Sequence, residues 1–125
     1  MERGKLFYFS RFFVRLAIGR WTADVPRPAG PTVYVCSHSD LAGPLTTLCW
    51  LPFACRTWVF HVFLDREMCR KQYRNYTFSR RFGMPGPLAE AAAWAASGFV
   101  SALMHSMGAI PVYRGTVRIA ATFRE

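Results

Sequence analysis

Two clusters of proline and glycine limit how this chain can fold more than any other feature. The segment 24–31, DVPRPAGP, holds three prolines and one glycine, and the segment 83–87, GMPGP, holds two of each. Proline lacks the amide hydrogen that a helix needs, so neither segment lies inside a helix. We interpret 24–31 as a linker after an N-terminal helix, and 83–87 as the stop between two later helices.

The composition is both apolar and basic. The 125 residues, a natural size for one domain, are 52% hydrophobic and 18% charged, which excludes an intrinsically disordered tail. Sixteen basic residues, fourteen of them arginine, stand against seven acids and give a net charge of +9. We expect anionic partners, and the aromatic share of 16% favours an interface with lipid.

Residues 5–21, KLFYFSRFFVRLAIGRW, have apolar side chains at helical spacing. Phe9, Phe13 and Leu16 recur on one side, and basic residues lie toward another. A basic amphipathic helix rich in aromatic residues is typical of an anchor at a membrane interface. The alternative is a helix that packs on the domain core with its arginine stems snorkelling. We assign residues 1–23 to this segment.

Strands and helices alternate over residues 32–125, which favours an α/β fold with a mixed sheet flanked by helices. The last predicted helix is long enough to cross a bilayer, but its alanine content favours burial or a shallow position in the membrane. We expect strands at 32–37, 56–63 and 109–113. We expect one helix that begins at residue 45, a second over 65–82 with Asp65 as its N-cap, and a third over 88–107.

The loop after the first predicted strand is the most informative. His38 lies there among small and polar residues, in the segment CSHSDLAGP at 36–44. In open α/β sheets, ligands bind beyond the carboxyl ends of the strands. A histidine, with an ordinary pKa of about 6.5, can act as a general base in such a place.

Several segments resemble the glycerolphosphate and lysophospholipid acyltransferase family. TVYVCSHSDLAGP, at 32–44, resembles the family's first block, in which an apolar strand leads to a His-x-x-x-x-Asp motif. MGAIPVYRG, at 107–115, resembles a later block, a glycine followed by an apolar strand that ends in arginine. The segment 63–83 resembles the region between these blocks in a bacterial branch of the family.

The resemblance implies a reaction and a place for it. His38 would remove a proton from the hydroxyl of a lysophospholipid or glycerolphosphate-like acceptor. The alkoxide would then attack an acyl thioester of coenzyme A or of acyl carrier protein, with no other cofactor. Arg114, with Gly115 beside it, would contact the acceptor's phosphate, a role that its forked guanidinium suits. The implied location is the cytoplasmic face of a membrane, peripheral or monotopic, with membrane lipids as partners.

Two features depart from the family pattern. Gly43 stands where the motif aspartate would be, and the nearby Asp40 either orients His38 or caps the helix that follows. The Glu-Gly pair of the family's third block does not occur up to Glu125. We therefore expect residues 32–125 to be the N-terminal portion of such a domain, and a non-catalytic lipid-binding fragment is the main alternative.

The other histidines and the cysteines predict no metal site. His61 alternates with apolar neighbours, which favours a packed or edge histidine, and His105 in the alanine-rich helix favours a satisfied core position. The histidines show no ligand spacing, and the cysteines lack C-x-x-C spacing. Since nothing in the sequence indicates export, we expect reduced thiols at Cys36, Cys49, Cys55 and Cys69.

The predicted helix over 65–82 is strongly basic. Its basic residues alternate with aromatic ones, which fits a solvated face, a surface for anionic headgroups or acyl carrier protein, or a nucleic-acid surface. We disfavour nucleic acid, because an RNA-binding protein has no use for an uncharged alanine-rich helix or an aromatic N-terminal helix. The basic residues are Arg66, Arg70, Lys71, Arg74, Arg80 and Arg81.

Overall fold

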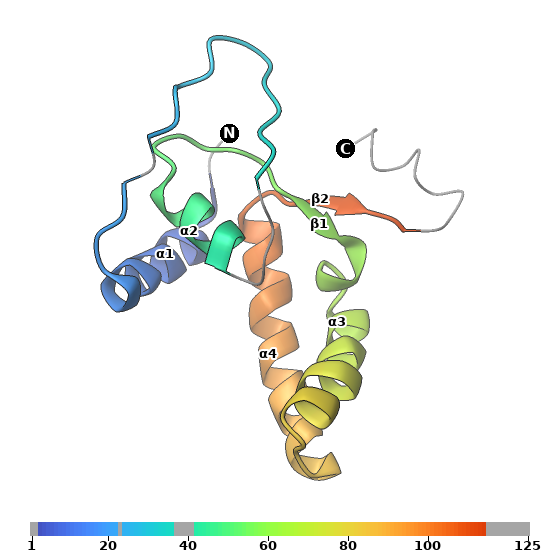
Figure 1. The fold of residues 1–125 in the computed structure, drawn as a ribbon. Helices are drawn as coiled ribbons and strands as arrows, with labels where there is room; N and C mark the ends of the chain where they lie inside the picture. The colour runs from blue at the N-terminus through green and yellow to red at the C-terminus, as the bar shows by residue number, and fades with distance from the viewer. Residues whose placement is uncertain (1–2, 23, 37–41, 115–125) are drawn as a thin grey trace. The chain divides into compact units, whose positions relative to one another are not determined.

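The computed structural model describes residues 3–22, 24–36 and 42–114 (Figure 1). The chain divides into two compact units, one holding Tyr8–Cys55 and the other Arg3–Phe7 with Arg56–Glu125. The elements are helices α1 (Lys5–Ile18), α2 (Ala42–Trp50), α3 (Arg66–Gln72) and α4 (Gly86–Ser106), the 3₁₀ turn η1 (His61–Phe63), the π-helix η2 (Tyr73–Arg81), and strands β1 (Trp58–Phe60) and β2 (Ile110–Val112).

The sheet consists of β1 and β2, which pair in parallel with Trp58 opposite Ile110 and Phe60 opposite Val112. Parallel neighbours need a crossover, and here α3, η2 and α4 provide it (Figure 1). The expectation of a mixed α/β architecture therefore holds in a coarse form, as a helix-rich fold with a small parallel sheet. The strands predicted over 56–63 and 109–113 both form, but each keeps only three residues.

The strand predicted over 32–37 is wrong in its described part, since residues 32–36 have no regular secondary structure. Val33 is 82% exposed and Val35 is 93% exposed. A strand is stabilised by its ladder with a neighbour, and no described strand pairs with this segment. Its β-branched residues therefore have neither a ladder nor a core to pack against.

The helix predicted over 65–82 forms, with a change of geometry in the middle. Asp65 is its N-cap, as expected, and Oδ1 accepts a hydrogen bond of 2.9 Å from the amide of Met68. From Tyr73 onward the helix is a π-helix, which is rare as a long segment. Gly83, with φ of +63°, follows the end of this helix, in a backbone region that favours glycine.

Helix α4 forms where the alanine-rich helix is predicted, and it packs on α3 and η2. Its buried side consists of small residues at four-residue spacing, which lets the neighbouring backbones approach closely. A side chain at Gly98 would place its Cβ 3.2 Å from Nη2 of Arg66, so the glycine makes room for that arginine. The buried small residues are Ala89, Ala93, Ser97 and Ser101.

Helix α1 is confirmed but ends at Ile18 rather than at residue 21. Gly19 ends it with φ of +91°, and the Gly19 amide donates to the Arg15 carbonyl at 3.1 Å. At the other end, the amide of Phe7 donates to the Ser106 hydroxyl at 3.0 Å, and Phe7 is buried. Among the helices that the structure describes, none combines the length and the apolar character that crossing a bilayer requires.

Candidate functional site

Of the predicted acyl-transfer site, the structure describes only Arg114. His38, Asp40 and Gly115 lie outside the described residues. Gly43 belongs to α2, which begins at Ala42 and therefore starts earlier than the helix predicted from residue 45. The structure therefore describes the predicted phosphate contact at the end of β2, but not the predicted histidine.

Arg114 lies at the carboxyl edge of the parallel sheet, two residues after the end of β2. Its guanidinium carbon is 4.9 Å from the ring centroid of Phe60, the last residue of β1, in a cation–π contact. Arg114 is exposed, and no carboxylate of the described residues forms an ion pair with it. An aromatic face thus holds the cation at the edge where α/β sheets bind ligands.

His61 lies beside Arg114's edge of the sheet and is packed, as the sequence indicates. Its ring stacks on Tyr113 with centroids 4.7 Å apart and meets Phe60 edge-on at 4.9 Å. Nδ1 lies 3.3 Å from the carbonyl oxygen of Val112. A carbonyl only accepts, so Nδ1 donates in this long hydrogen bond. His61 therefore joins β1 to β2 beyond their last ladder bonds.

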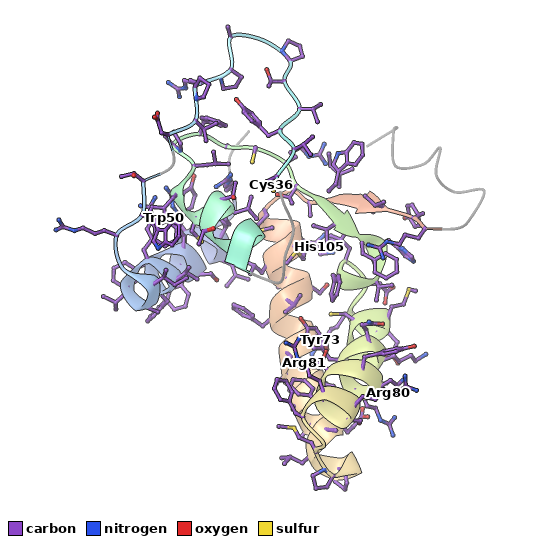
Figure 2. The ribbon with its side chains drawn as sticks, in the orientation of Figure 1. Cys36, Trp50, Tyr73, Arg80, Arg81 and His105 are labelled. Atoms are coloured by element: carbon purple, nitrogen blue, oxygen red, sulfur yellow. The ribbon has the colours of Figure 1, made fainter. Side chains whose placement is uncertain are left out.

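His105 is satisfied, but it is exposed rather than in the core (Figure 2). Its Nε2 lies 2.9 Å from the carbonyl oxygen of Leu64, and the hydroxyl of Ser101 donates to the same oxygen at 3.0 Å. The expectation of a core position is wrong, because His105 lies in the last turn of α4 and makes this contact from an exposed position. Within the described segments, no group of three or more His, Cys, Asp and Glu residues could hold a metal ion.

An ion-pair network engages part of the basic surface on α3 and η2. Arg70 pairs with Glu90 of α4 and, at 2.6 Å, with Glu67, while Nε of Arg74 lies 3.0 Å from Glu90. The hydrogen bond from Arg70 holds the pKa of Glu67 below its ordinary value. Lys71 lies 4.0 Å from Glu67. The two pairs with Glu90 bind α3 and η2 to α4, whereas the two pairs with Glu67 lie within α3, so this part of the basic face has a structural role.

The remaining basic residues of this surface lie on aromatic rings or in solvent. Arg66 covers Trp94 at 5.2 Å, and Arg80 covers Tyr76 at 5.1 Å. Arg80 points away from α4, and neither it nor Arg81 forms an ion pair with a described carboxylate (Figure 2). The sequence alone missed the neutralised half of this surface, because Glu90 lies on a different helix.

Helix α1 exposes an apolar stripe. The stripe consists of Phe9, Phe12, Phe13 and Leu16, which recur at helical spacing on one side. Phe12 is 63% exposed and Leu16 is 72% exposed. The rings of Phe9 and Phe13 meet edge-on at 4.8 Å, and those of Phe12 and Phe13 at 5.5 Å. An exposed apolar patch of this kind marks an interaction surface.

The arginines of α1 contact α2. Nε of Arg11 donates to the Cys49 carbonyl at 2.7 Å, and Nε of Arg15 donates to the same oxygen at 2.9 Å. The guanidinium carbon of Arg15 also lies 5.6 Å from the ring centroid of Trp50. The last carbonyls of a helix lack partners within it and carry partial negative charge, so cations stabilise this end. The polar side of α1 is thus engaged, while the stripe is exposed.

The buried Cys69 and the half-buried Tyr73 show pKa shifts that argue against chemistry at their positions. Cys69 on α3 is fully buried, and burial raises the pKa of its thiol to about 11. Burial also raises the pKa of Tyr73, whose ring stacks on Phe78 at 5.8 Å. Both groups stay neutral at ordinary pH, so we interpret them as packing residues.

Comparison of the chain with protein-family models, with curated proteins and with solved structures finds no match.

Proposed function

We propose that this chain takes part in acyl transfer to the hydroxyl of a phosphorylated lipid acceptor at a membrane surface. The observation that carries the proposal is the position of Arg114 at the carboxyl edge of the β1–β2 pair. Its guanidinium lies over Phe60 and forms no ion pair with a described carboxylate, so its N–H fork is available for a phosphate. The likeness of the segments around His38 and Arg114 to acyltransferase blocks supplies the reaction.

In this proposal, the chain's own residues bind the acceptor and move one proton. Arg114, which Gly115 follows in the chain, holds the acceptor's phosphate. His38 accepts the proton of the acceptor hydroxyl as its oxygen attacks the thioester carbonyl of acyl-CoA or acyl carrier protein. The carbon–sulfur bond then breaks, and the departing thiolate takes the proton from His38. Asp40 orients His38, or a backbone carbonyl does so in its place.

The apolar stripe on α1 supports a membrane surface as the place of this reaction. Four large side chains are exposed on one side of a single helix, while Arg11 and Arg15 bond to the end of α2. A lysophospholipid acceptor partitions into the bilayer and its diacyl product stays there, so a surface that enters the interface favours its encounter with the enzyme. A helix with an aromatic and aliphatic face is suited to that position.

The test is acyl transfer from radiolabelled acyl-CoA to lysophosphatidate in mixed detergent micelles. We expect His38→Ala to abolish turnover. We expect Arg114→Ala to raise the KM for lysophosphatidate about tenfold and Arg114→Lys to restore part of the loss, because lysine keeps the charge but not the fork. Arg80→Ala is the matched control, since Arg80 is an equally unpaired arginine outside the sheet edge. Undiminished activity of His38→Ala would refute the assignment.

A second candidate function is lipid binding without catalysis. The sequence observation that favours it is Gly43, which stands where the motif aspartate would orient the histidine. It predicts that the chain sediments with vesicles and has no turnover with either acyl donor. Turnover that depends on His38 would exclude this candidate.

A further inference from the structure

We propose that a groove at the C-terminal end of α1 binds the phosphate group of an anionic lipid and so fixes the depth and orientation of the stripe at the bilayer. This inference rests on the proposed function, acyl transfer at a membrane surface. The groove is formed by residues of the unit that contains Tyr8–Cys55, whereas Arg114 belongs to the other unit. Its cations are Arg15 and Arg20, and its aromatic walls are Trp21 and Trp50.

The groove has the charge of a phosphate site and room for more than a phosphate. It is an open hollow of about 740 Å³, and the described residues that line it include two arginines and no acidic residue. Neither Arg15 nor Arg20 forms an ion pair with a described carboxylate. Two guanidinium groups on one hollow without a counterion favour an anion, and a phosphate accepts hydrogen bonds from both.

Arg15 is held in place before any ligand binds. Its Nε donates to the Cys49 carbonyl at 2.9 Å, and its guanidinium carbon lies 5.6 Å from the Trp50 ring centroid. The Nε contact uses one of the five N–H groups, and the two terminal nitrogens carry the other four. Because the side chain is already restrained, binding an anion there costs less conformational entropy than ordering a free arginine.

The backbone at the end of α1 places the second cation. Gly19 adopts φ of +91°, and its amide bonds to the Arg15 carbonyl at 3.1 Å. This turn ends the helix, and Arg20 and Trp21 then line the groove. Helix carbonyls repel anions, but the carbonyls of Arg15 and Cys49 are already engaged by hydrogen-bond donors.

The surroundings of the groove favour a lipid phosphate over a free one. Leu16 lines the groove and is also the last residue of the stripe, so apolar surface continues from the stripe to the cations. Trp21, which is 56% exposed, adds a residue type that is enriched at the level of lipid headgroups. A ligand with a phosphate next to acyl chains matches both parts, whereas a free phosphate uses only the arginines.

The experiment measures binding to phosphatidylcholine vesicles with and without phosphatidate by sedimentation. We expect Arg20→Ala to weaken binding to the phosphatidate vesicles about tenfold and to leave the weaker binding to neutral vesicles unchanged. Arg27→Ala is the charge-matched control in the same unit, and we expect a change below about twofold, as for an exposed charge outside a site. Arg15→Lys, which keeps the charge, should also weaken binding, with helix content checked by circular dichroism.

Equal losses in Arg20→Ala and Arg27→Ala would overturn the proposal, because the attraction would then come from the overall charge rather than from the groove. A second arm distinguishes the source of the phosphate. Inorganic phosphate is titrated at constant ionic strength while the tryptophan fluorescence is recorded. Weak or absent quenching by phosphate, with tight vesicle binding, supports a lipid ligand. Saturation by phosphate at the affinity seen for vesicles would overturn it.

Vesicle binding and turnover test the groove and the proposed acyl transfer separately. Vesicle binding needs no turnover, so His38→Ala should bind phosphatidate vesicles like the unaltered chain. Vesicle selectivity that depends on Arg20, without any turnover, would refute acyl transfer and keep the groove. Turnover in detergent micelles with no selectivity for phosphatidate vesicles would refute the groove and keep acyl transfer.

Discussion

Nε of Arg11 donates a hydrogen bond of 2.7 Å to the main-chain carbonyl of Cys49, one residue before the end of α2. Nη2 of the same arginine lies 3.5 Å from the carbonyl of Leu51. Arg11 thus contacts two carbonyls at the C-terminal end of a helix, where partners within the helix are missing. In most surface helices the apolar side packs inward. Here Arg11 and Arg15 of α1 contact a neighbour, and the phenylalanines of the stripe are exposed.

Replacing Arg11 with alanine should destabilise the chain. The side chain gives charge-assisted hydrogen bonds to a helix end in a half-buried position, which contributes about 1 to 2 kcal/mol to the free energy of unfolding. Urea unfolding followed by circular dichroism measures the change. Arg27→Ala is the control, because Arg27 is exposed in the linker. Equal midpoints for the two variants would show that the contact with Cys49 adds no stability.

Phe12→Ser should weaken binding to neutral vesicles with little loss of stability. Phe12 is 63% exposed and its ring meets Phe13 of the same stripe, so the folded chain loses little packing, whereas a bilayer loses the burial of an aromatic side chain. Burial of a phenylalanine contributes about 1.5 to 3 kcal/mol, and we expect at least a tenfold loss in partitioning. Phe99→Ser is the matched control, since Phe99 is 49% exposed on α4. Equal losses in both variants would contradict a role specific to the stripe.

The helical period of residues 5–18 could be predicted from the sequence, but not the side of α1 that packs. Periodicity shows which side chains share a face, and the partner of that face depends on other parts of the chain. Cys49 and Leu51 accept hydrogen bonds from Arg11 through their backbone carbonyls. Every residue has such a carbonyl, so the residue type does not show which one will accept. The N-cap at Asp65 could be predicted, because a cap is decided within three residues.

The pairing of Glu67 with Arg70 should make stability depend on pH in the acid range. The hydrogen bond from Arg70 lowers the pKa of Glu67 below its ordinary value of 4.5, so the folded chain holds the carboxylate more strongly than the unfolded chain. The stabilisation is therefore complete above pH 4.5 and is lost as the pH falls through the lowered pKa. Thermal unfolding between pH 6 and pH 3 measures it, and Glu67→Gln should have a flatter profile. Parallel profiles would contradict the pairing.

The sequence predicts an α/β arrangement and the positions of two strands, but not the extent or the pairing of the sheet. Apolar runs mark β1 and β2 correctly, and the two strands pair in parallel rather than in the mixed sheet that we expect from the sequence. The same pattern at 32–36 gives no strand, because a strand also needs a free sheet edge in register. The candidate site at the sheet edge was likewise predictable only in part. Arg114 could be placed after a strand from the sequence, but its contact with Phe60 depends on which strand is the neighbour.

Cys69 should resist alkylation in the folded chain. Burial raises the pKa of its thiol to about 11, so at pH 8 only about one molecule in a thousand carries the reactive thiolate, and the sulfur is also inaccessible. Iodoacetamide labelling followed by peptide mass spectrometry measures the rate. The exposed Cys36 is the internal control and should react rapidly under the same conditions. Equal rates for the two thiols in the folded chain would contradict the buried position of Cys69.

The same raised pKa should make the folded chain lose stability at high pH. Between the ordinary value of 9.0 and about 11, the unfolded chain releases the Cys69 proton while the folded chain retains it. The unfolded state therefore binds fewer protons in this range, and the free energy of unfolding falls as the pH rises. Urea unfolding at pH 8 and pH 10 should show this fall, and Cys69→Ala should reduce it. A fall of the same size in Cys69→Ala would assign it to other groups, among them Tyr73, whose pKa is also raised by burial.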